Sequence, residues 1–270
     1  MELTVRTPLT PIQSSCFIIG KHETGSFEML VNVGEARRIG VDFQLGNTLA
    51  AVAGALNAAA FHAVGFFSAN MTGNVSLVSD HLATGDFSLG LFAGLIVVSF
   101  VCGAALSTLL VNAGRRRKIA GIYAYSILLE ASLLVGLGFV DIFANASVRT
   151  SILVFGLSFL MGLQNAIVTR ISNARIRTTH VSGMATDIGI GIGMLCDIAL
   201  GHERKIDSGE TASKLLLHLN IVASFLLGGL IGVAIYREFE AALLFIAAGI
   251  LYVLAVPGVL KTRSQRVRTE

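Results

Sequence analysis

Long apolar runs, separated by short polar stretches, follow one another along the chain from about residue 45 onward. Six windows that are free or almost free of charge each reach or exceed the roughly 20 residues that a helix needs to cross a membrane. These windows are 46–69, 87–114, 119–140, 150–169, 215–236 and 241–260. Because the runs are continuous rather than alternating, they predict helices, and we expect an all-α polytopic membrane protein with six transmembrane helices.

Four parts follow from this pattern: a cytoplasmic N-terminal tail at 1–44, a first three-helix unit at 45–142, a second at 149–260 and a basic cytoplasmic C-terminal tail at 261–270. The first part has neither the apolar stretch nor the cleavage pattern of a signal peptide, so we expect it to be a tail.

The two units resemble each other in sequence. The segment "GALNAAAFHAVGFFSANMTGNVSLVS" aligns with "GLQNAIVTRISNARIRTTHVSGMATDIG" if two residues are inserted in the second segment. The aligned pairs are Gly54 with Gly162, Asn57 with Asn165 and Gly73 with Gly183. Farther on, "SFVCGAALS" is echoed by "SFLLGGLIG". Since each unit has an odd number of spans, we predict two inverted repeats, each with a polar Gly-centred break after its first helix.

Composition supports the membrane assignment and excludes several other classes. Apolar residues make up 54% of the chain and charged residues only 14%, against roughly 25% charge in a soluble domain. The three cysteines show no ligand spacing, which indicates neither a disulfide framework nor a metal site. No catalytic or nucleotide-binding motif occurs, so we expect no enzyme and no cofactor. The basic residues form no stripe with aromatics, and we expect no nucleic-acid partner.

The positions of Lys and Arg predict the orientation. If "RRRK" at 115–118 is cytoplasmic and the chain crosses six times, eighteen of the twenty basic residues lie on that side. Only Arg149 and Arg237 fall outside. We therefore predict a bacterial inner-membrane protein with both termini in the cytoplasm. An alternative stays open, in which Asn70–Leu82 and Thr178–Leu200 also cross and give eight spans.

Two motifs carry a family resemblance: "ANMTGN" after the first span, and "GLQNA" followed by "RTTHVSGMATDIG" in the middle. Over roughly Leu45 to Leu260 the chain resembles the YoaK-type bacterial membrane proteins, a family built around a domain of unknown function. The resemblance implies a six-span inner-membrane protein and a small-molecule transporter without an established substrate. Family members commonly carry Asp where this chain has Asn57, so a carboxylate that could handle a proton is absent there.

Polar groups at membrane depth are tolerated only where they are buried in protein or line a watery cavity. A helix that starts there presents free N–H groups and partial positive charge to an anion. The sequence "NMTGN" can also cap such a helix start, because Asn and Thr side chains bond the free N–H groups. The candidate substrate-binding residues are Asn57, Asn70, Thr72, Gly73, Asn74, Gln164, Asn165, Arg170, Arg177, Thr179, His180, Ser182, Gly183, Thr186 and Asp187. The alternative is that small residues only let helices pack closely, as in the Gly-x-x-x-Gly motifs that begin at Gly189 and Gly228.

Two further ionisable residues lie within apolar spans, where a functional role is the first hypothesis. Glu130 sits in the middle of "YSILLEASLLVG", and His62 lies in "AAFHAVGF". Each side chain could instead contribute only to packing, with its hydrogen bonds made to neighbouring groups. Asp187 belongs to the repeated phrase and ranks above both.

Two functions from different classes fit these patterns. The first is a secondary transporter or facilitator that moves a small polar molecule, anions included, across the inner membrane and binds it between the two polar breaks. The alternative is a non-transporting membrane scaffold or assembly protein. The expected partners are the lipid bilayer and an unidentified small molecule, and homo-oligomer formation stays open. The charge of any site should come mainly from the second half.

Overall fold

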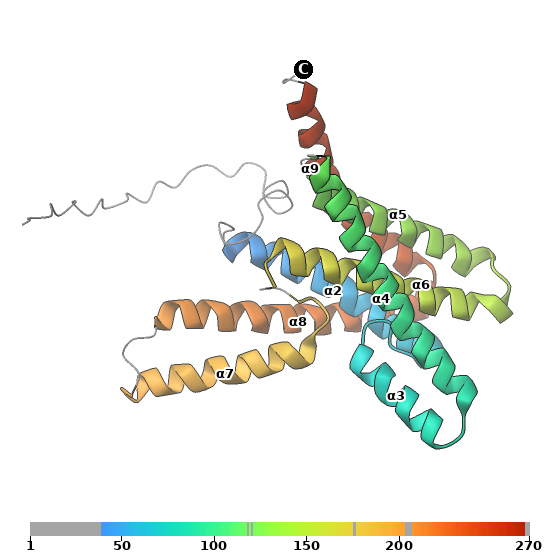
Figure 1. Ribbon diagram of the computed structural model, residues 1–270, viewed down its shortest axis with the longest axis horizontal. Coiled ribbons are helices and arrows are strands. Elements are labelled where there is room, and N and C mark those ends of the chain that lie inside the picture. Colours follow the sequence, from blue (N-terminus) through green and yellow to red (C-terminus); the bar gives the residue numbers. More distant parts are fainter. Residues whose placement is uncertain (1–38, 118, 120, 175–176, 203–206, 268–270) are drawn as a thin grey trace, which may run out of the picture.

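The computed structural model describes residues 39–117, 119, 121–174, 177–202 and 207–267. These residues form helices and contain no strand, which confirms the all-α prediction for the described part of the chain (Figure 1). The helices are α2 (Ile39–Val64), α3 (Met71–Ala83), α4 (Phe87–Arg116), α5 (Ile122–Phe143), α6 (Ala146–Ile171), α7 (Val181–Ala199), α8 (Ser208–Phe239) and α9 (Ala242–Val267). The predicted N-terminal tail lies almost wholly outside the described residues. At the other end, α9 runs past the predicted boundary at residue 260.

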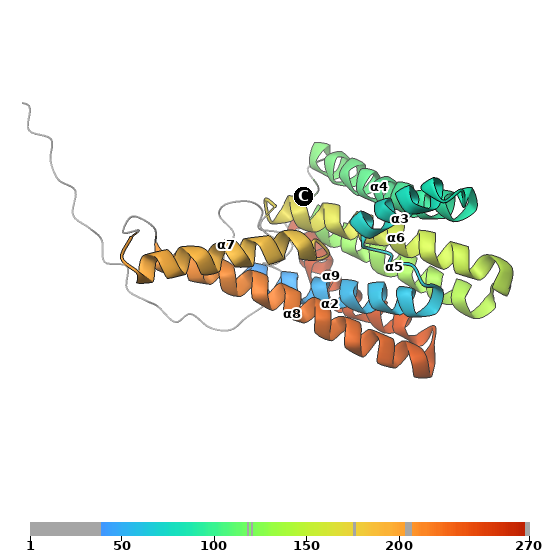
Figure 2. The ribbon, with the colours of Figure 1, turned by 90° about the horizontal axis from the view of Figure 1, so that it is seen from below.

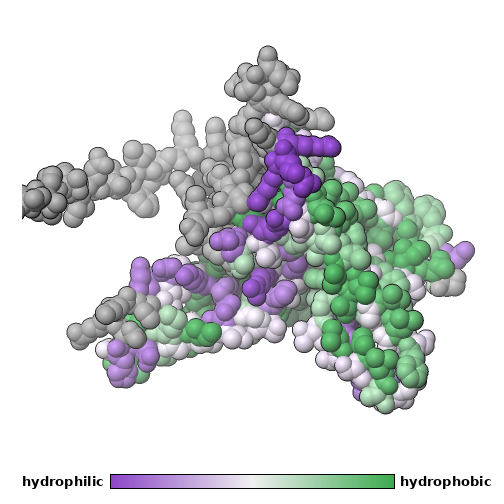
Figure 3. Space-filling view, viewed as in Figure 1, coloured by the Kyte–Doolittle hydropathy of each residue, from purple (hydrophilic) through white to green (hydrophobic). Residues whose placement is uncertain are grey.

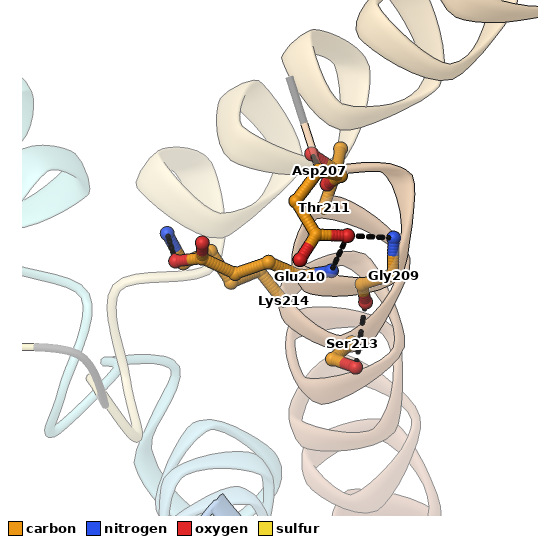
Figure 4. A network of polar contacts seen from close by, with 6 residues as sticks. All are labelled: Asp207, Gly209, Glu210, Thr211, Ser213 and Lys214. Atoms are coloured by element: carbon orange, nitrogen blue, oxygen red, sulfur yellow. Dashed lines mark hydrogen bonds and ion pairs between the residues drawn. The ribbon is translucent and has the colours of Figure 1, made fainter. Parts of the chain in front are cut away.

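Side chains define where the two longest helices begin. Asp86 precedes α4 and accepts a hydrogen bond from the Leu89 N–H at 3.2 Å. Asp207 precedes α8 and accepts from the Gly209 N–H at 2.8 Å (Figure 4). Such caps satisfy N–H groups that have no partner within the helix. In the last turn of α4, basic residues complement the negative end of the helix dipole.

Seven of the described helices are long and apolar enough to cross a membrane, which makes this an integral membrane protein. Only α3 is excluded, because its 13 residues extend about 20 Å at 1.5 Å per residue. The prediction of six spans is not confirmed by length and composition, since α7 also qualifies. In the view of Figure 3, apolar residues cover most of α3, α4 and α5, whereas hydrophilic residues gather at the upper end of α4 and over the α7–α8 hairpin.

Glycines bring helices of the two units into backbone contact. A Cβ atom added at Gly54 in α2 would overlap the carbonyl oxygen of Phe225 in α8, and one added at Gly228 in α8 would overlap that of Ala51. Glycines also bring the backbones of α4 and α6 into contact. Close approach of this kind, which only a residue without a side chain permits, is the usual means of packing helices in lipid.

A second pair of glycines repeats this geometry between α4 and α6. A Cβ atom at Gly103 would overlap the carbonyl oxygen of Phe159, and one at Gly162 would overlap that of Phe100. Each of these contacts joins a helix of the first unit to a helix of the second. The core of the protein is therefore made between the units rather than within them.

Contacts also establish the relative directions of the packed helices. Gly228 and Gly232 of α8 contact Ala51 and Ala55 of α2 in the same order, so α2 and α8 run parallel. Ser158 and Arg170 of α6 bond successive parts of α4, at Ile96 and Asn112, so α4 and α6 also run parallel. In contrast, Gly121, which precedes α5, and Gly138 within α5 lie against Thr262 and Phe245 of α9 in reverse order, so these helices are antiparallel.

The shorter helices α3 and α7 begin near the middle of the bundle. In the α3–α4 hairpin, Val78 lies opposite Gly94 and Leu82 opposite Gly90. Because both helices rise about 1.5 Å per residue, Met71 lies at about the level of Val101, close to the glycine contact at Gly103. In Figures 1 and 2 the first turns of α3 and α7 lie near each other at the centre of the molecule, and the two helices point away in different directions.

The same reasoning places the start of α7. Gly191 of α7 lies against Leu215 of α8 in the second hairpin. Ten residues earlier in α7 and ten later in α8, Val181 therefore lies at about the level of Phe225. Phe225 is the residue that Gly54 contacts, so both short helices start at the level of the glycine contacts.

Candidate functional site

The first polar break folds back against α2. Gly65, which takes a positive φ of 76°, follows the last residue of α2. The chain then turns back along α2, and the Ala69 N–H donates a hydrogen bond to Asn57 Oδ1 at 2.8 Å. The Asn74 side chain donates to the Phe67 carbonyl oxygen at 2.9 Å. Asn57 and Asn74 are both buried. These two predicted residues therefore hold the break against the bundle by binding backbone groups.

The start of α3 is capped by its own sequence. Asn70 accepts a hydrogen bond from the Gly73 N–H at 3.1 Å through Oδ1, as the capping hypothesis predicts. Gly73 lies inside the first turn of α3, so the prediction that the break centres on this glycine is wrong, and the bend lies at Gly65 instead. Thr72 is exposed, and its carbonyl oxygen accepts from the Ser76 hydroxyl.

The second break differs from the first in its cap and its charge. Asn173 and Ala174 take positive φ after α6, and no described side chain caps the N-terminus of α7, which begins after His180. The Arg177 guanidinium lies 3.9 Å from the position of a Cβ atom on Gly183, in the first turn of α7. Arg177 therefore supplies positive charge where α7 starts.

Two neighbouring amides on α6 carry unused acceptors. Gln164 donates across to the Leu49 carbonyl oxygen in α2 at 3.1 Å, and Asn165 donates to Met161 of its own helix at 2.8 Å. Both side chains are buried, and their Oε1 and Oδ1 atoms have no partner among the described residues. A buried amide oxygen without a donor is costly, so this position favours a donor from water or a ligand.

Two buried hydroxyls in the breaks lie outside the set of candidate binding residues. Ser68 and Thr178 are fully buried at 0% exposure, and neither hydroxyl oxygen has a partner within the described part of the chain. Each lies just before the start of a short helix. The alignment of "SAN" with "TTH" could have identified them, because it puts a hydroxyl residue two positions before each N-cap.

The remaining predicted residues do not join this group. Arg170 bonds Asn112 of α4, and Thr179 is half-buried before α7. Ser182 and Thr186 are exposed on α7 and bonded to each other through the Ser182 carbonyl oxygen. His62 is exposed near the end of α2.

Glu130 is fully buried in α5, and neither carboxyl oxygen has a partner among the residues described. The hydroxyls that lie nearby in sequence are engaged elsewhere: Ser126 bonds the carbonyl oxygen of Ile122, and Tyr123 accepts from Arg115. The alternative that small residues only pack helices closely holds for Gly228 but not for Gly189 and Gly193, since a Cβ atom added at either of the latter two would meet no described atom within 4 Å.

Asp187 lines a groove of about 620 Å³ between α7 and α8, together with Arg177. Two other charges in the groove neutralise each other, because Lys214 Nζ lies 2.7 Å from Glu210 Oε1 (Figure 4). Arg177 thus connects the start of α7 with the groove that contains Asp187.

Arg170 should contribute to stability rather than to binding. Its Nη2 donates to Asn112 Oδ1 at 3.0 Å and its Nη1 approaches the Thr108 carbonyl oxygen at 3.5 Å. We expect Arg170→Met to lower the free energy of unfolding by about 1.5–3 kcal/mol, the range for a hydrogen bond that involves a charged group. Thermal unfolding in mild detergent, followed by circular dichroism, measures the change. Arg177→Met is the matched control, and an equal loss in both variants would contradict the assignment.

The comparisons with known proteins agree with the sequence motifs. No curated protein and no solved structure matches the chain. A family described as "Protein of unknown function (DUF1275)" matches residues 45–256, which include both polar breaks and every helix from the second turn of α2 into α9. That match covers most of the chain and confirms the family resemblance predicted from the motifs, so this integral membrane protein belongs to the DUF1275 family.

Proposed function

We propose that the protein is a secondary transporter or facilitator for a small polar molecule, anions included, and that the molecule binds between the two polar breaks. The observation that carries this proposal is the pair of short helices that start near the middle of the bundle. Helix starts at such depth leave polar backbone inside the membrane, which is tolerated where it lines a cavity or is buried in protein. Interrupted helices of this kind form the binding sites of many secondary transporters.

We further propose that the two units are inverted repeats. The four glycine contacts fall at aligned positions: Gly54 and Gly162 each meet the Phe of an aligned "SF" pair, at 225 and 100. The hairpins α3–α4 and α7–α8 correspond in the same way, and the contact pairs α2–α8 and α4–α6 exchange when the units are exchanged. A pseudo-twofold axis in the membrane plane accounts for this correspondence.

The helix directions favour six crossings, with α3 and α7 as re-entrant helices. If both short helices turn back, α2 and α8 run parallel, α4 and α6 run parallel, and α5 opposes α9, as their contacts require. If α7 alone crossed, α8 would oppose α2. If α3 and α7 both crossed, α5 and α9 would run parallel. With six crossings, the distribution of Lys and Arg puts both termini in the cytoplasm of a bacterial inner membrane.

Within this site, the second break supplies the charge. At the first helix start Asn70 already caps one N–H group, whereas α7 has no side-chain cap in the described structure and has Arg177 against its first turn. Free N–H groups together with a guanidinium suit a carboxylate or phosphate group. The anionic end of a substrate should therefore bind at the start of α7.

Thiol labelling tests whether the two helix starts face water. In a variant with Cys16, Cys102 and Cys196 replaced by serine, we expect Thr72→Cys and Ser182→Cys to react with a charged, membrane-impermeant thiosulfonate reagent. The reagent should reach Cys at 72 from outside and Cys at 182 from inside. Leu91→Cys and Leu226→Cys are the controls, since both side chains are exposed on apolar helix faces and should resist labelling.

The scaffold alternative makes the opposite prediction. If the polar breaks only pack the bundle or face lipid, neither position will react, and proteoliposomes will show no protein-dependent flux of small anions, neutral polyols or zwitterions. That combination would overturn the transport proposal.

A further inference from the structure

A second polar cluster lies far from the helix starts, at the end of the bundle where α2, α5 and α8 end and α6 and α9 begin. Asp141 in the last turn of α5 and Arg149 in the first turn of α6 both line two adjoining cavities there. Tyr236 lines the first cavity and Glu240 the second. None of these residues belongs to the repeated polar phrases.

The carboxylate of Asp141 is buried but lacks hydrogen-bond donors among the described residues. Its side chain is only 1% exposed, and Arg149 Nε stands 3.7 Å from Oδ1, beyond hydrogen-bond distance. The Arg149 guanidinium instead donates to the main-chain oxygen of Asp141 at 3.3 Å. Neither carboxylate oxygen has a hydrogen-bond donor among the described residues. Because a buried charge needs both an opposite charge and hydrogen bonds, this carboxylate can accept a further donor.

The surroundings define what kind of donor fits. The first cavity has a volume of about 60 Å³, and apolar side chains that include Leu56, Leu153 and Leu244 form much of its wall. Since one water-sized group needs roughly 10–15 Å³ by this measure, the cavity holds a chain of about four heavy atoms. Around the two cavities, Asp141 and Glu240 outnumber Arg149, so the lining charge is negative.

We propose that this pocket binds the primary ammonium group of a small aliphatic molecule, with the ammonium on the Asp141 carboxylate and the alkyl chain in the apolar cavity. An ammonium group carries a positive charge and offers three N–H donors, and hydrogen-bond donors are what the Asp141 carboxylate oxygens lack. Arg149 lies close enough to receive a carboxylate if the molecule is a zwitterion. This inference concerns binding alone and does not rest on transport or on the site between the helix starts.

Saturation-transfer NMR on the purified protein in detergent tests the inference with three ligands of matched length: propylammonium, β-alanine and propionate. We expect saturation of the propylammonium signals with a dissociation constant in the low millimolar range, about what four heavy atoms permit. β-Alanine should bind as tightly as propylammonium or more tightly if Arg149 binds its carboxylate. It should bind more weakly than propylammonium if the pocket is specific for a simple amine. Both results support recognition of ammonium. Binding of propionate alone, or of none of the three, would overturn it.

Variants separate the roles of the two charges. Asp141→Asn should weaken propylammonium at least tenfold, whereas Glu238→Gln, an exposed carboxylate outside both cavities, should leave it unchanged. Arg149→Gln removes the competing cation and should strengthen propylammonium several-fold, which keeps the test informative if Asp141→Asn fails to fold. Loss of propylammonium binding in Arg149→Gln would contradict the proposal.

Discussion

Gly162→Ala should destabilise the protein by about 3 kcal/mol, at the upper end of the usual cost of overpacking a close contact. The added Cβ atom would overlap the carbonyl oxygen of Phe100, which belongs to the backbone of α4 and cannot rotate away. The helices α4 and α6 would have to separate, and the contacts along both would loosen. The yield of monodisperse protein and the thermal midpoint in mild detergent measure this loss.

Gly136→Ala is the matched control, because a Cβ atom added at Gly136 on α5 would meet no described atom within 4 Å. That variant should be neutral or more stable by up to about 1 kcal/mol, since alanine favours a helix over glycine. Equal stability of the two variants would show that α4 and α6 do not make backbone contact at Gly162.

Asn57→Leu should cost about 2 kcal/mol and release the first polar break. The substitution keeps a side chain of similar size but removes the acceptor of the Ala69 N–H, leaving a buried donor unsatisfied, at a cost of roughly 1–3 kcal/mol. Hydrogen exchange of a peptide that covers residues 65–70 should become faster, and the thermal midpoint should fall.

The Asn57→Asp variant distinguishes loss of the hydrogen bond from loss of the side-chain amide group. A carboxylate oxygen accepts from the same N–H, and the family resemblance implies Asp at this position, so this variant should keep slow exchange over 65–70. If Asn57→Leu exchanged as slowly as Asn57→Asp, the hydrogen bond would not anchor the break.

Local sequence was enough to predict six of the long helices and the N-cap of α3. Charge-free windows marked six of the long helices, and "NMTGN" identified Asn70 as a cap, since a capping side chain bonds N–H groups within three residues. The position of the bend was not predictable in the same way. Gly65 and Gly73 are both glycines near the end of an apolar run, and only the return of Ala69 to Asn57 distinguishes them.

Residues that meet across the fold escaped prediction. Arg149 stood out in the sequence as one of two basic residues on the outer side, yet the structure places it beside the buried Asp141. The pocket there gathers residues from the ends of five helices, and no spacing along the chain marks such a set. The partner of Arg170 was hidden for the same reason, because Asn112 lies 58 positions away.

The pairing of helices between the units has a consequence for how the protein is made. Gly232 of α8, which contacts Ala55 of α2, is synthesised roughly 10–35 s later at about 5–20 residues per second. During that interval α2 is already in the membrane, and lipid must occupy its small-residue face. Final assembly therefore follows membrane insertion. Until the second unit is inserted, the helices of the first unit are only loosely associated. The second unit then displaces the lipid and completes the core.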